Sequence, residues 1–135
     1  MGRDVLDALH AARHAEKEQA LYYRALALKA EEADDAVTAE RLNGLHADEQ
    51  HHLSRLTARL LELDQSMQDL PSAAPARVSL DDWETGARQR EKHEIARYES
   101  LLRLGVDAKT GTMIREFLDA ERRHESELGG KWMAA

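Results

Sequence analysis

Both prolines of the chain, Pro71 and Pro75, stand close together near its middle, and almost every other residue favours helix. Proline lacks an amide hydrogen and clashes with the preceding helical turn, so residues 69–79 are not expected to form a regular helix. Elsewhere Leu, Ala, Glu and Arg dominate and β-branched residues are scarce, a composition of strong helix formers. The sequence therefore predicts an all-α protein with one long connection.

Helical periodicity and capping signals divide the chain into four predicted helices. They are expected at about residues 4–33, 35–68, 80–104 and 110–128, with residues 69–79 as a crossover between the second and the third. Asp34 or Asp35 suits the start of the second helix, Ser79 that of the third, and Gly105 the position after the third. Short turns predict two antiparallel helical hairpins, and a crossover of about 11 residues reaches some 36 Å when extended. We therefore expect a four-helix bundle, formed as a single domain by residues 1–135.

Charge and composition exclude several classes of protein. The formal net charge is −7, and no basic stripe is present, which argues against nucleic-acid binding. The chain has no cysteine, which excludes a disulfide scaffold, a cysteine zinc site and an iron–sulfur cluster. It has no apolar run of membrane-spanning length and no signal-peptide core at its beginning. The expectation is a cytoplasmic protein that binds neither nucleic acid nor membrane.

Glutamates and histidines occur in the middle of helical stripes that are expected to be buried. The stripe residues of the four helices are Leu9, Glu16, Ala20, Tyr23 and Ala27; Leu42, Leu45, Glu49, His52, Leu56 and Leu63; Ala87, Glu91, Glu94, Tyr98 and Leu101 or Leu102; and Ile114, Phe117, Glu121, His124 and Leu128. A buried carboxylate without compensation costs several kcal/mol. Two divalent cations would balance four such glutamates.

Each predicted hairpin carries the same pattern of donors. A glutamate is followed after seven residues by a tyrosine, and the partner helix carries Glu-x-x-His; the two sets are Glu16, Tyr23, Glu49 and His52, and Glu91, Tyr98, Glu121 and His124. The two glutamates are 33 residues apart in the first hairpin and 30 in the second, nearly symmetric about each turn. Glu-x-x-His places both side chains on one helix face, and carboxylates with imidazole suit iron or manganese and accept zinc. The pattern predicts a centre for two metal ions.

Simpler interpretations exist for these residues. The six Glu and His side chains could form charged surface faces, but four helices would have to be mis-phased together. Tyr23 and Tyr98 could be ordinary packing residues, and Glu94 a solvated helix glutamate. His51 should point about 100° away from His52 on a helix and is predicted to be exposed. The remaining histidines lack a matched partner and are predicted to lie on the surface or beside the site: His10, His14, His46 and His93.

The segments EKEQALYY, DEQHH, EKHEIARY and ERRH resemble the ferritin-like di-iron carboxylate superfamily, and specifically its rubrerythrin-like branch. The resemblance covers about residues 4 to 128 and implies a ferritin-like bundle with two iron ions. It implies that Glu49 and Glu121 bridge the metals, that Glu16 and Glu91 are terminal ligands, and that His52 and His124 each supply one nitrogen. It further implies that Tyr23 and Tyr98 hydrogen-bond ligand carboxylates and that Glu94 joins the oxidised cluster.

One departure from this family affects the expected function. Rubrerythrins proper carry a rubredoxin domain, whose cysteine-bound iron feeds electrons to the di-iron pair, and this chain has no cysteine. A catalytic form would need an external electron-donor protein. The resemblance implies a di-iron oxidoreductase, a peroxidase or ferroxidase that oxidises a ferrous pair with peroxide or dioxygen. The alternatives are a non-catalytic iron-binding or sequestration protein and a metal-free interaction bundle. A homodimer is the expected assembly, since two-fold dimers are the commonest oligomers.

Overall fold

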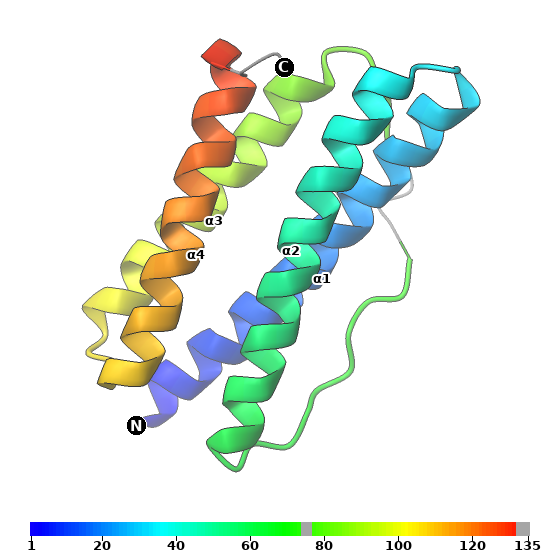
Figure 1. The fold of residues 1–135 in the computed structure, drawn as a ribbon. Coiled ribbons are helices and arrows are strands. Elements are labelled where there is room, and N and C mark those ends of the chain that lie inside the picture. Colours follow the sequence, from blue (N-terminus) through cyan, green and yellow to red (C-terminus); the bar gives the residue numbers. More distant parts are fainter. Residues whose placement is uncertain (74–76, 132–135) are drawn as a thin grey trace. The chain divides into compact units, whose positions relative to one another are not determined.

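The computed structural model describes residues 1–73 and 77–131, and the regular elements in this part of the chain are all helical. Its helices are α1 (Arg3–Glu32), α2 (Ala36–Glu62), α3 (Trp83–Arg103) and α4 (Ala108–Ser126), followed by the short π-helical segment η1 (Glu127–Lys131) (Figure 1). The prediction of an all-α chain is confirmed, and four helices are compatible with a four-helix bundle. None of the described helices combines the length and apolar character that a membrane crossing requires.

The chain divides into two compact units. One unit is Arg13–Asp81, which we call the α1–α2 unit. The other consists of Met1–Ala12 and Asp82–Ala135, and we call it the α3–α4 unit; the first residues of α1 belong to it. Within the α3–α4 unit, α3 packs on α4, and η1 packs on both. The predicted crossover, residues 69–79, follows α2 without regular helix where it is described, and its residues 74–76 lie outside the described part.

The turn between α1 and α2 is closed by two aspartates. The amide of Asp35 donates to the carbonyl of Ala30 at 2.9 Å, and that of Asp34 donates to Glu31 at 3.1 Å. Asp34 has φ of 57°, so α1 ends in a Schellman motif with aspartate at the left-handed position. The Asp35 carboxylate then accepts from the amide of Thr38 at 3.1 Å, which caps α2. Of the two predicted caps, Asp35 has the role.

α2 ends at Glu62, earlier than the predicted end at residue 68. Asp64 adopts a left-handed conformation with φ of 60°, and its amide donates to Leu61 at 3.0 Å. The amide of Gln65 donates to Leu60 at 3.0 Å. This is a second Schellman motif, and it turns the chain away from the helix axis before the first proline is reached.

α3 also begins later than predicted, at Trp83 rather than near residue 80. Asp82 precedes it with φ of 51°, so the helix cannot extend backwards through that residue. The Ser79 hydroxyl accepts an amide hydrogen bond from two residues further on, and so closes a turn instead of capping the helix. At the other end Gly105 has φ of 82°, as predicted for the residue after α3, and the side chain of Asp107 caps α4.

The core follows the predicted stripes except at Leu63, which follows the end of α2 and is only partly buried. Buried stripe residues include Leu9, Leu42, Leu45, Leu56, Ala87, Ile114, Phe117 and Leu128. Burying one such leucine, isoleucine or phenylalanine side chain stabilises the fold by about 1.5–3 kcal/mol. The same stripes carry the glutamates and histidines, so these polar groups are placed in the interior by the packing of their apolar neighbours.

Candidate metal centre

The predicted metal ligands on the doubled motif are all buried. Glu16, Glu49, Glu91 and Glu121 are 0% exposed, His52 is 4% exposed and His124 is 1% exposed. The interpretation of these residues as charged surface faces is therefore wrong. Charged groups are almost never fully buried unless they are paired or coordinate a metal. Because these carboxylates are buried, a positive charge close to them is needed to balance their negative charge.

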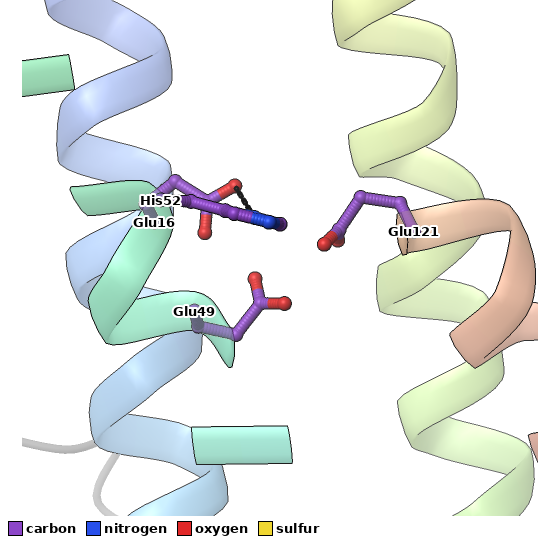
Figure 2. A group of neighbouring side chains, drawn as sticks. All are labelled: Glu16, Glu49, His52 and Glu121. Atoms are coloured by element: carbon purple, nitrogen blue, oxygen red, sulfur yellow. Dashed lines mark ion pairs between the residues drawn. The ribbon is translucent and has the colours of Figure 1, made fainter. Parts of the chain in front are cut away.

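The α1–α2 unit brings Glu16, Glu49 and His52 together. Each offers a donor atom within 4.8 Å of those of the other two. The imidazole Nδ1 of His52 lies 3.6 Å from Oε1 of Glu16, and Figure 2 shows these two side chains beside the carboxylate of Glu49. The helical spacing of Glu49 and His52 places both on one face of α2. We call these three residues the α1–α2 half-site.

The α3–α4 unit holds the equivalent group, Glu91, Glu121 and His124. Their donor atoms also lie within 4.8 Å of one another. The Nδ1 atom of His124 is 3.6 Å from Oε1 of Glu91 and 3.7 Å from Oε1 of Glu121. These three residues form the α3–α4 half-site. Each predicted hairpin has thus assembled its own glutamate with the Glu-x-x-His pair of the partner helix.

The chemistry of each half-site fits one divalent cation. Two ionised carboxylates with donor oxygens no more than 4.8 Å apart repel by about 3 kcal/mol at an effective dielectric constant near 20. A divalent cation turns that repulsion into attraction and balances the two charges. Carboxylate oxygens with one imidazole nitrogen form a donor set that suits iron, manganese or zinc. The buried Glu and His groups could therefore hold metal ions.

The three other predicted site residues are buried as well. Tyr23 and Tyr98 are 0% exposed, and the ring of Tyr98 packs against Phe117 with 5.8 Å between ring centroids. Glu94 is 6% exposed, and its Oε1 lies 3.8 Å from Nε of Arg97. Glu94 is thus not a solvated helix glutamate. Among the described residues it is not part of either donor group, and its role as a ligand stays a prediction.

Two histidines are more involved in the interior than their sequence positions indicated. The ring Nδ1 of His46 lies 2.9 Å from the carbonyl oxygen of Ala20, which ties α2 to α1. His46 is one turn before Glu49 on α2, a spacing that already made it the least certain surface residue among these histidines, and it is partly buried. His10 is 7% exposed. His51, as predicted, is exposed.

Comparison with known proteins adds no assignment. No family model matches the chain, and no curated protein matches it. The interpretation of the half-sites therefore depends on their own donors, burial and spacing.

Proposed function

We propose that this chain is a ferritin-like dinuclear iron protein of the rubrerythrin kind, and that it acts as an oxidoreductase on peroxide or dioxygen. The observation that carries the proposal is the pair of buried half-sites, each with two carboxylates and one imidazole whose donor atoms lie within 4.8 Å. Two ions would balance the four carboxylates of the two half-sites. Di-iron bundles use this composition, one Glu from each of two helices and Glu-x-x-His from each of the other two.

Contacts within the α1–α2 unit support the antiparallel hairpin that the proposal requires. As the residue number rises along α1, the number of the α2 residue in contact with it falls. The pairs are Arg13 with Thr57, Glu16 with His52, Ala20 with His46, and Arg24 with Asn43. Glu16, Glu49 and His52 would hold metal in the α1–α2 half-site, and Glu91, Glu121 and His124 would do so in the α3–α4 half-site.

When bound, a ferrous pair supplies the two electrons that convert one hydrogen peroxide and two protons into two waters. The part of the protein is to hold the donors at a fixed spacing, keep bulk water out and balance charge. Tyr23 and Tyr98 would donate hydrogen bonds to ligand carboxylates, and Glu94 would add negative charge that favours the ferric state. Electrons for repeated turnover would come from a separate donor protein, and we propose a homodimer as the assembly.

Metal analysis of the purified full chain tests the binding part of the proposal. We expect about two iron ions per chain after anaerobic reconstitution. His52→Ala should lower the metal content, whereas His51→Ala is the matched control, because His51 is the exposed neighbour on the same helix. Equal metal content in the two variants would contradict the assignment of His52.

Rapid mixing of the ferrous protein with hydrogen peroxide tests the catalytic part. Fast oxidation followed by many turnovers in the presence of a reductant supports an oxidoreductase. A single slow, stoichiometric oxidation would instead identify an iron-binding or sequestration protein. A chain that binds no metal under these conditions would be the metal-free interaction bundle.

A further inference from the structure

A surface groove of about 530 Å³ lies between residues of α1 and α2 in the α1–α2 unit. Two cationic residues line it, Arg13 and Lys17 on α1, together with the polar residues Gln50, Ser54 and Thr57 on α2. Among the described residues that line it there is no aspartate or glutamate. In a chain whose formal net charge is −7, a groove with two cations and no carboxylate is an unusual local environment.

The positive charge of Arg13 is held in place by neutral groups. Its Nε donates to the hydroxyl of Thr57 at 2.9 Å, and its Nη1 donates to the carbonyl of Gln68 at 3.0 Å. Arg13 is only 8% exposed. Within residues 1–73 and 77–131, neither Arg13 nor Lys17 makes an ion pair with a carboxylate. A guanidinium has five N–H donors, so Arg13 retains donors beyond these two bonds.

A buried guanidinium without a carboxylate is expensive unless an anion compensates it. Two positive charges match the two negative charges of a phosphate monoester, and guanidinium and ammonium donors are the usual protein groups that bind phosphate. Gln50 and Ser54, on α2, add neutral side-chain donors to the lining of the same groove. The charge of the groove therefore favours a dianion over a neutral ligand.

Apolar residues also line the groove. Leu53, Leu61 and Leu70 line it, and Leu61 is 56% exposed. Exposed apolar surface in the same groove as two cations suits a ligand with an anionic head and a short apolar substituent. We propose that this groove binds a small phosphate monoester with an apolar substituent, whose phosphate is held by Arg13 and Lys17 and whose apolar part covers the leucines.

Isothermal titration calorimetry of the full chain with hexyl phosphate tests the proposal. We expect saturable binding that weakens as ionic strength rises, no binding of 1-hexanol, and about tenfold weaker binding of inorganic phosphate because apolar contact is lost. Lys17→Gln should weaken binding of hexyl phosphate about tenfold through loss of one charge-assisted contact. The matched control is Lys29→Gln, the same change on the same helix outside this groove, and it should bind as the wild type does.

A second variant guards against effects on folding. Leu61→Glu changes an exposed residue and places a carboxylate in the groove, so it should also weaken binding about tenfold or more by like-charge repulsion. All titrations are made on chelator-treated and on iron-loaded protein, and the losses should be the same in both. Absence of saturable binding to the wild type, equal affinity of the Lys17→Gln and Lys29→Gln proteins, or equal affinity for hexyl phosphate and inorganic phosphate would overturn the proposal.

Discussion

Replacement of Glu49 by glutamine is expected to change the stability of this protein in opposite directions with and without metal. Glu49 is 0% exposed and belongs to the α1–α2 half-site with Glu16 and His52. Glutamine has almost the same shape but carries no charge. The metal-free protein should therefore become more stable, because one of two neighbouring buried carboxylates is removed. The metal-loaded protein should become less stable, because a ligand is lost.

The magnitudes follow from the spacing of the half-site. Donor oxygens of Glu49 and Glu16 within 4.8 Å repel by about 3 kcal/mol at an effective dielectric constant near 20. The new amide needs hydrogen-bond partners, which reduces the gain by about 1–2 kcal/mol. We expect a net gain of about 1–2 kcal/mol in the free energy of unfolding of the metal-free protein. With metal at a hundred times its wild-type dissociation constant, a variant that no longer binds forfeits about 2.7 kcal/mol of ligand-linked stability.

Urea denaturation at neutral pH measures both effects, once with chelator and once with excess ferrous ion under anaerobic conditions. Glu40→Gln is the matched control, because Glu40 is an exposed glutamate on the same helix, and it should leave both stabilities unchanged. If Glu49→Gln lowered the stability of the chelated protein, carboxylate repulsion would not be the dominant energy in the half-site. If ferrous ion stabilised the wild type and the variant equally, Glu49 would not be a ligand.

Three further predictions concern the fold. Asp64→Gly should raise the free energy of unfolding by about 1 kcal/mol, because Asp64 has φ of 60°, a conformation that glycine adopts without strain; no gain in urea denaturation would contradict this. Asp35→Ala should destabilise the protein at neutral pH, since side-chain and backbone hydrogen bonds from Thr38 hold the pKa of Asp35 below its ordinary value of 3.8. Because the pKa of Asp35 is lowered in the folded state, its stabilising contribution is present above the unfolded-state pKa and is lost as pH falls through the folded-state pKa. The difference in stability between variant and wild type should therefore disappear in acid. A difference that does not change with pH would argue against a charged cap at Asp35. Leu56→Ala, in the buried core, should cost about 2–5 kcal/mol in thermal denaturation, and a loss below 1 kcal/mol would show a site that collapses around the cavity.

Local chemistry and helical periodicity were enough to predict much of this protein. Asp35 and Gly105 were recognisable because a helix start needs a side-chain acceptor and a helix end tolerates a left-handed residue. The burial of Glu49 and His52 was predictable because they continue a leucine stripe on α2. The grouping of Glu16 with this pair followed from near-symmetric spacing about the turn. Each of these signals lies within one helix or one hairpin.

The features that were not predicted depend on weak backbone conformational preferences or on contacts between residues that are far apart in the sequence. Asp64 and Asp82 end α2 and delay α3 by adopting positive φ, which aspartate does more often than most residues but far less often than glycine. The periodic pattern continues past Asp64, so periodicity alone placed the end of α2 too late. The bond from Arg13 to the carbonyl of Gln68 joins residues that only the tertiary structure brings together.

The repetition of the half-site bears on how many ions the protein binds. Each unit has its own pair of carboxylates with donor oxygens within 4.8 Å and its own imidazole. One divalent cation balances one such pair, so a single ion per chain would leave the mutual repulsion of the other two carboxylates, about 3 kcal/mol, in place. Binding should therefore continue to about two ions per chain rather than stop at one. A clear plateau at one ion would mean that the two half-sites, despite identical donors, do not have equivalent roles.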